Sequence, residues 1–222
     1  MATGAPIPMH IDLAHLTLMQ WFSPGFPVGA FAYSHGLETV VADGQVTEAS
    51  AFSDWLADIL QHGAGRTDAI LLHAAHGAEP DGLGRIDALA LALCPSSERR
   101  LETQAQGAAF ARTTAAVWGG AAAPHCYPVA VGAAARQAGL DPVRTCAAYL
   151  HGFAANLTSA AIRLVPLGQT AGQRVLAQAT PRCHDLAVQT AALTLEDIGS
   201  SSFAADIASM RHECHYSRLF RS

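Results

Sequence analysis

The segment DPVRTCAAYLHGFAANLTSAAIRL, Asp141–Leu164, decides the fold of this chain. Its opening Asp-Pro pair is typical of a helix start, because Asp accepts a free backbone N–H and Pro lacks one. Apolar residues then recur every three or four positions, which predicts an amphipathic helix. They are Val143, Ala147, Leu150, Ala154, Leu157 and Ala161. The small residues among them allow close packing against neighbouring helices, and the sequence VPLG at 165–168 ends the pattern.

The same periodicity recurs along the rest of the chain. No segment alternates as a strand does, so we expect one all-α domain of eight to ten helices over residues 1–222, less regular near its N-terminus. The expected helices lie at 47–63, 68–76, 85–93, 96–119 and 141–164, then in two segments divided at Thr180-Pro181, and last in a segment with Phe203, Ile207, Met210 and Cys214 on one face.

Composition indicates a globular protein with some apolar surface. Of 222 residues, 50% are hydrophobic and 14% are charged, and a mean hydropathy of +0.21 suggests that a partner covers part of the surface. The charge-free run 113–135 contains Gly and Pro, so it predicts two buried helices joined by a turn and no membrane span. Five scattered Cys and no signal-peptide pattern predict reduced thiols in a cytoplasmic protein.

The charges exclude two classes of function. The net charge is −5, and all 13 basic residues are Arg. A Walker A phosphate loop needs a Lys, so the chain does not bind a nucleotide in that way. No basic stripe is present, which argues against nucleic-acid binding.

The segment SPGFPVGAFAYSHGLE, 23–38, is unlike the helical remainder. Its prolines and glycines favour a rigid turn, and its aromatic residues can either brace the core or dock a partner. Bracing is favoured, because Trp21, Phe22 and Val28 extend the same apolar patch. Ser34 sits in a sequence similar to a nucleophile elbow, yet no strands supply the sheet that such an elbow needs. We therefore expect no catalytic residue.

Two pairs of histidines have the spacing of metal ligands. His73 with His76, and His212 with His215, each lie three residues apart, and Cys214 adds a thiol to the second pair. Spacing fixes no third ligand for the first pair, and a chain with 11 His forms such pairs by chance. We expect no intrinsic metal or other cofactor, with His212, Cys214 and His215 as weak candidates.

The last segment, DIASMRHECHYSRLFRS, spans 206–222. It is amphipathic and then ends in Arg-Leu-Phe-Arg, which offers apolar groups to bury and guanidinium groups to pair with carboxylates. Folding back on its own domain and docking a partner are equally good interpretations of this tail from its residues.

Three segments together resemble the urease accessory protein F family: 23–38, SAAIRLVPLGQTAGQRVL at 159–176, and the tail at 206–222. They lie in order near the start, middle and end of the chain. Three departures from the family pattern occur: His35 replaces a common Gln, Cys214-His215 replaces Thr-Gln, and Phe26 replaces an aliphatic residue.

The resemblance implies a non-enzymatic, all-helical, dimeric and cytoplasmic protein. Such a protein bridges accessory protein D and the GTPase accessory protein G on apo-urease, and the complex handles nickel and GTP. The family's C-terminal segment is associated with binding protein D, which favours partner docking for the tail at 206–222. The family is also proposed to modulate the GTPase and to offer an internal route for nickel.

The resemblance also supplies the expected partner contacts. These are Tyr33, Glu38, Arg163, Gln169, Gln173, Asp206, His212, Glu213, Arg218, Leu219, Phe220 and Arg221. The alternative is a nickel carrier that uses His212, Cys214 and His215. No nucleic acid or membrane is expected as a partner.

Overall fold

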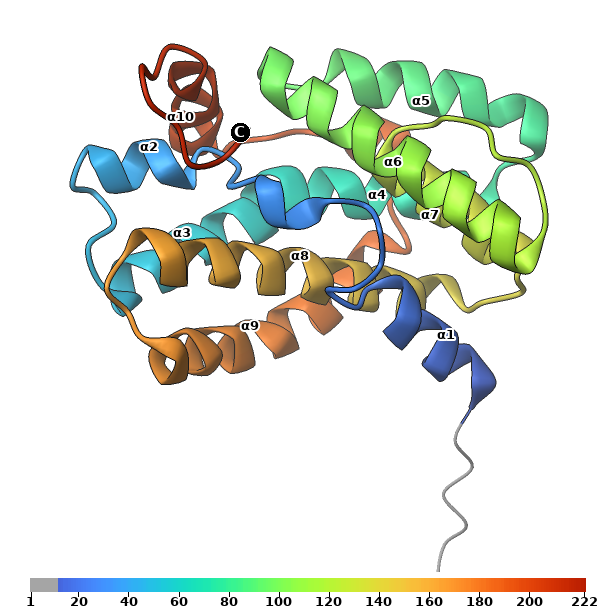
Figure 1. Ribbon diagram of the computed structural model, residues 1–222. Coiled ribbons are helices and arrows are strands. Elements are labelled where there is room, and N and C mark those ends of the chain that lie inside the picture. Colours follow the sequence, from blue (N-terminus) through green and yellow to red (C-terminus); the bar gives the residue numbers. More distant parts are fainter. Residues whose placement is uncertain (1–11) are drawn as a thin grey trace, which may run out of the picture.

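The computed structural model describes residues 12–222, and these contain helices and connections but no strand. Figure 1 shows how the ten α-helices are arranged. They are α1 (Leu13–Trp21), α2 (Leu37–Ala42), α3 (Ala49–His62), α4 (Ala64–Gly77), α5 (Leu83–Ala92), α6 (Ser97–Trp118), α7 (Tyr127–Gln137), α8 (Pro142–Leu164), α9 (Gln169–Thr190) and α10 (Phe203–His212). The expected all-α fold is confirmed.

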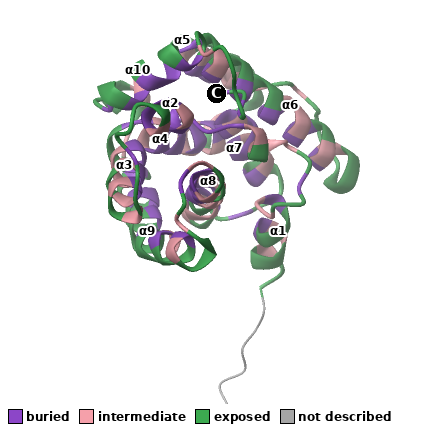
Figure 2. Cartoon of the chain, turned by 60° about the vertical axis from the view of Figure 1, so that its left-hand side comes forward, coloured by how far each residue is buried: buried purple, intermediate pink, exposed green. Residues whose placement is uncertain are grey.

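Helix α8 lies at the centre of the domain. It packs against α9, α4, α3, α7, α2 and α1, and Figure 2 shows it nearly end-on, with the other helices around it. Leu150, Ala154, Leu157 and Ala161 are fully buried on this helix. Their periodic spacing in the sequence therefore forms the face that the neighbouring helices cover.

A second layer is made by α4, α6 and α7, which pack closely because two glycines have no side chain. A Cβ on Gly107 of α6 would lie 1.9 Å from the carbonyl oxygen of His125. A Cβ on Gly132 of α7 would lie 2.4 Å from the carbonyl oxygen of Leu72 in α4. Both distances are shorter than any real Cβ contact, so these positions require glycine.

The helix starts expected at 96 and 141 are confirmed, whereas the helices expected to begin at 47, 68 and 85 begin at 49, 64 and 83. The Asp141 side chain accepts the backbone N–H of Arg144 at 2.7 Å and caps α8. The Ser96 hydroxyl accepts the N–H of Arg99 at 3.1 Å and caps α6.

The expected division at Thr180-Pro181 is wrong. Helix α9 continues from Gln169 to Thr190 with Pro181 inside it. The Thr180 hydroxyl donates to the carbonyl of Leu176 within the helix, so it does not cap a new one. Burial of Val175 on one side of the proline and Leu186 on the other keeps the helix against the core.

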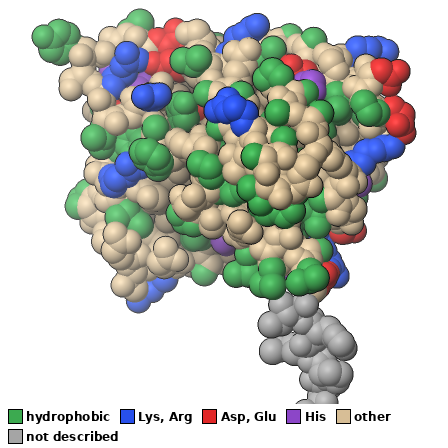
Figure 3. Space-filling model, turned by 45° about the vertical axis from the view of Figure 1, so that its right-hand side comes forward, with side chains coloured by type: hydrophobic (Ala, Val, Ile, Leu, Met, Phe, Trp, Pro, Cys, Tyr) green, Lys and Arg blue, Asp and Glu red, His purple; other side chains and the backbone are tan. Residues whose placement is uncertain are grey.

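The charge-free run 113–135 forms the end of α6, a connection and most of α7. It is only partly buried, because Val117 and Trp118 are exposed. None of the described helices is long and apolar enough to span a membrane. Figure 3 shows hydrophobic side chains gathered where the described chain begins, and helix α1 there exposes Leu13, Leu16 and Met19.

Candidate functional site

The segment 23–38 packs its aromatic side chains into the domain. Phe26 and Tyr33 are buried, and the Phe26 ring lies 5.4 Å from that of Phe110 on α6. Trp21 contacts the same Phe110 ring edge-on at 5.1 Å. The segment therefore braces the core, although Phe31 is exposed.

The chain end lies along this segment, and we name residues 213–222 the C-terminal strap. Ser34 donates both its backbone N–H, at 2.8 Å, and its hydroxyl to the carbonyl oxygen of Ser222. The backbone N–H of Arg221 donates to the carbonyl of Ala32 at 2.8 Å. The strap thus folds back on its own domain and pairs with the segment 23–38.

Glu38 at the start of α2 fastens the strap. Its two carboxylate oxygens accept the backbone N–H groups of Leu219 at 2.7 Å and Phe220 at 2.9 Å. Burial raises the pKa of Glu38, but these N–H donors and His212 outweigh it, so the pKa lies below its ordinary value. Arg163 lies 4.3 Å over the Phe220 ring and donates to the carbonyl of Phe31 at 2.8 Å.

His212 joins three parts of the site. Its side chain is fully buried, with Nδ1 2.6 Å from Glu98 and Nε2 3.1 Å from Glu38. Arg218 of the strap pairs with the same Glu98, so α2, α6 and α10 meet at one cluster of charged groups.

Glu213 occupies the N-terminus of α6. Its carboxylate accepts the backbone N–H and the hydroxyl of Ser97, both at 2.7 Å, and the N–H of Glu98 at 3.4 Å. The Ser97 hydroxyl, with these N–H groups, lowers the pKa of Glu213. This carboxylate satisfies donors that a helix start leaves free.

A buried polar network lies beneath the strap. Glu102 accepts from His35 Nε2 at 2.8 Å, from Gln106 at 2.9 Å and from the Ser222 hydroxyl at 2.9 Å. Arg99 lies 3.5 Å from Glu102 and donates to Asp68 at 3.0 Å.

The charges in this network compensate one another. Burial raises the pKa of Glu102, but the charges of His35 and Arg99 outweigh it and lower the pKa. Burial alone lowers the pKa of Arg99, and the two carboxylates reverse this and raise it. The Tyr149 hydroxyl completes the network by donating to Asp68 at 2.7 Å.

The outer face of α10 is apolar and uncovered. Phe203, Ile207 and Met210 are 68%, 54% and 48% exposed, and they lie one turn apart. We name these three residues the α10 stripe. Cys214, expected on the same face, lies beyond the end of the helix. Tyr216 and Leu219 of the strap are exposed as well.

The structure divides the expected partner contacts into two groups. Tyr33, His212 and Phe220 are buried and Glu38 is half-buried. These four residues attach the C-terminal strap to the rest of the domain. The remainder lie wholly or partly at the surface: Arg163, Gln169, Gln173, Asp206, Glu213, Arg218, Leu219 and Arg221. Of these, Gln169 and Gln173 lie on α9 and therefore on a different element from the strap.

The contribution of α6 was not expected from the sequence. Glu98 and Glu102 contact the C-terminal strap and the residues beneath it. Arg99 and Gln106 in turn contact Glu102. Their spacing of four residues places Glu98, Glu102 and Gln106 on one helix face, and this spacing is the signal that could have revealed them.

The other candidates make structural contacts. Ser34 is fully buried, and its hydroxyl lies between the Ser222 carbonyl and the Glu38 N–H, with no base beside it. His73 and His76 each bond a backbone carbonyl at 3.0 Å.

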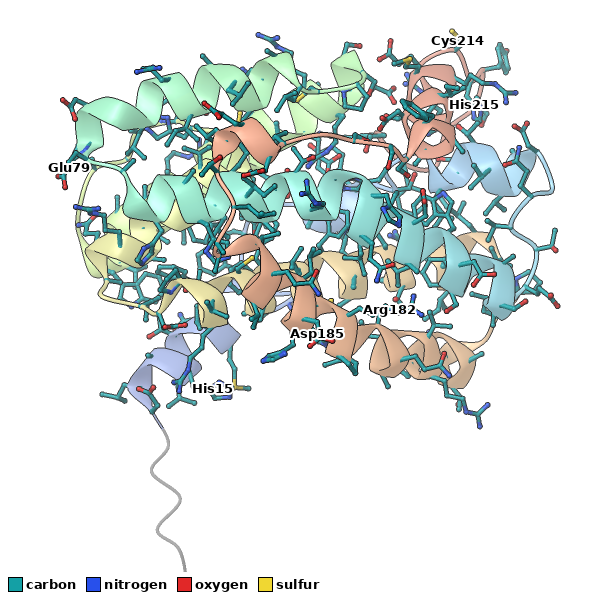
Figure 4. The ribbon with its side chains drawn as sticks, turned by 180° about the vertical axis from the view of Figure 1, so that it is seen from behind. His15, Glu79, Arg182, Asp185, Cys214 and His215 are labelled. Atoms are coloured by element: carbon teal, nitrogen blue, oxygen red, sulfur yellow. The ribbon has the colours of Figure 1, made fainter. Side chains whose placement is uncertain are left out.

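Both nitrogens of His212 lie against carboxylates within the domain, so neither faces an open position for a metal ion. Figure 4 shows Cys214 and His215 at the end of α10, with Cys214 on the outside. Within residues 12–222, no group of three or more His, Cys, Asp or Glu is arranged to hold a metal ion.

Comparison with known proteins places the chain in a family. The family model described as UreF matches residues 46–180. The chain is 51% identical to the urease accessory protein UreF of Roseobacter denitrificans, over 94% of each chain. It is also 51% identical to the protein of that name in Cereibacter sphaeroides, over 94% of this chain and 99% of the relative. It is 46% identical to the protein of that name in Azorhizobium caulinodans, over 99% of this chain and 98% of the relative. The chain therefore belongs to the UreF family of urease accessory proteins.

Proposed function

We propose that this protein is a cytoplasmic scaffold that bridges accessory protein D and the GTPase accessory protein G on apo-urease. In this role it supports GTP-dependent insertion of nickel without catalysing a reaction itself. Membership of the UreF family supports the accessory role. The specific partners, and assembly as a homodimer, follow from the family resemblance of the three sequence segments.

The observation that carries the proposal is the α10 stripe on a rigid base. Three large apolar side chains, each about half exposed or more, would be costly to leave in water on a folded protein. Helix α10 cannot shift freely, because His212 at its end is held by Glu38 and Glu98. A preorganised apolar face is suited to a protein partner, since little ordering entropy is lost on binding. We assign protein D to this face.

The nickel-carrier alternative has less support. It needs His212 as a ligand, and that ring would first have to lose two carboxylate contacts. In the scaffold role, nickel is cargo of the assembled complex and needs no site on this chain.

The test is binding of accessory protein D by full-length variants of the α10 stripe. We expect Ile207→Ser combined with Met210→Ser to weaken binding at least about tenfold, equivalent to about 1.4 kcal/mol. Val188→Ser on α9 is the matched control, because Val188 is 49% exposed and lies on another helix. Unchanged affinity in the double variant would remove the docking role from α10, whereas equal losses in both variants would show that the effect is not local.

A further inference from the structure

A cavity of about 510 Å³, open to solvent, lies between the segment 23–38 and helices α6 and α8. Figure 1 shows this segment crossing α8 on its way from α1 to α2. The residues that the structure places around the cavity belong neither to the α10 stripe nor to the C-terminal strap. Cavities of this size in proteins commonly hold small molecules.

Part of the lining is apolar and held in place. Phe22 and Phe26 of the segment and Phe153 of α8 line the cavity. The Phe22 ring meets the Tyr149 ring edge-on at 6.1 Å, and the Phe26 ring lies 5.4 Å from the Phe110 ring. Aromatic rings that are fixed by their neighbours present flat apolar faces at little cost in entropy, so they favour a ligand with a flat apolar body.

Another part of the lining is polar, and its charges are paired with one another. His35, Arg99 and Glu102 line the cavity. Glu102 lies 2.8 Å from His35 Nε2 and 3.5 Å from Arg99, and Arg99 also donates to Asp68 at 3.0 Å. A charged ligand would have to compete for partners that are already engaged, so this lining favours a neutral ligand.

Two further polar groups on the lining keep capacity for hydrogen bonds. Within residues 12–222, the Tyr127 hydroxyl has no hydrogen-bond partner, and burial raises its pKa, so it is a neutral O–H donor. Gln106 is 5% exposed and donates its Nε2 to Glu102 at 2.9 Å, which leaves its side-chain carbonyl as an acceptor. Buried polar groups are rarely left without a partner. A donor and an acceptor on one cavity match an amide, which offers a C=O next to an N–H.

We propose that this cavity is a binding site for a small neutral molecule that joins a flat apolar body to an amide group. The body lies against Phe22, Phe26 and Phe153. The amide oxygen accepts from the Tyr127 hydroxyl, and the amide N–H donates to the Gln106 carbonyl. The site goes beyond the scaffold role and does not depend on it, because it shares no residue with the α10 stripe.

The test is binding of benzamide to the full-length protein, compared with three molecules that keep its ring and change its polar group. Benzoate is an anion, benzamidine is a cation, and toluene has no polar group. Each is titrated by ligand-observed NMR. We expect benzamide to bind with a Kd of about 1–10 mM, as is usual for so small a molecule. Benzoate and benzamidine should bind at least about tenfold more weakly, because each carries an unpaired charge.

Two variants locate the benzamide. Tyr127→Phe should weaken benzamide at least about fivefold and leave toluene unchanged. Because the Tyr127 hydroxyl has no partner within the described chain, this variant should keep the fold. Ala155→Phe fills the cavity from α8 and should abolish binding of both molecules. Its matched control is Ala116→Phe on α6, which is exposed and lines no part of the cavity, and this variant should bind as the unmodified protein does.

Three results would overturn the proposal. One is the absence of saturable benzamide binding up to about 50 mM, well above the expected Kd. Another is tighter binding of benzoate or benzamidine than of benzamide, which would contradict a neutral ligand. The third is benzamide binding that Tyr127→Phe leaves unchanged, which would show that the polar lining does not recognise the amide. This third measurement decides the matter even if Ala155→Phe does not fold.

Discussion

Replacing Gly36 by Ala tests whether the segment 23–38 and α10 pack together as tightly as the structure shows. Gly36 has φ of +79°, and a Cβ there would lie 2.7 Å from the backbone nitrogen of Ser209 and 3.2 Å from the Cβ of Ala208, both in α10. The left-handed conformation costs about 1–2 kcal/mol for a residue with a Cβ. Forcing extra volume into a packed contact adds about 1–3 kcal/mol. We therefore expect Gly36→Ala to lower the free energy of unfolding by about 2–5 kcal/mol.

Gly44→Ala separates these two contributions. Gly44 has φ of +73°, but nothing lies within 4 Å of the position of its Cβ. Gly44→Ala should therefore lower the free energy of unfolding only by the cost of the left-handed conformation, about 1–2 kcal/mol. Urea denaturation of both variants gives the difference, expected to be about 1–3 kcal/mol. Equal losses would refute the close contact with α10, and with it the rigid base that we assign to the docking face.

Three further predictions concern the interior and the strap. Gly107→Ala should lower the free energy of unfolding by about 3 kcal/mol or more, because its Cβ would meet a backbone carbonyl. Gly84→Ala, in open space on α5, should raise it by up to about 1 kcal/mol, and thermal denaturation compares the two variants. Tyr149→Phe removes a hydrogen-bond donor from buried Asp68 and should lower the free energy of unfolding, measured by urea denaturation, by about 1–2 kcal/mol. An unchanged free energy would mean that this hydrogen bond is not formed. The lowered pKa of Glu38 contributes stability that is present above its ordinary value of 4.5 and is lost as the pH falls through the folded pKa. The protection of the strap amides from hydrogen exchange, relative to their intrinsic rates, should therefore fall below about pH 4.5, and Glu38→Gln should remove that dependence on pH.

The helical architecture could be predicted because it depends on local signals. The cap at Asp141 and the spacing of Leu150 and Leu157 indicate one helix with one buried face, and the structure has both. The failure at Pro181 is physical: a proline removes one hydrogen bond, and packing on both sides of it outweighs that loss.

The site was harder to predict because it depends on residues far apart in the chain. Glu38, Glu98 and His212 lie on three helices, and no local pattern shows that they meet. The residues of the tail suit both folding back and docking a partner, and only the family resemblance favours docking. The structure folds the tail back through Phe220, while the α10 stripe before it stays exposed.

The central claim is that this chain is needed for nickel insertion into urease. The most direct measurement is the nickel content and activity of purified urease from cells with and without this chain, at non-saturating nickel and with no second copy of the family present. We predict normal amounts of urease that is nickel-poor and inactive without the chain. The unmodified chain should restore the nickel, and the Ile207→Ser, Met210→Ser variant should not. Urease fully loaded with nickel in the absence of the chain would contradict the account.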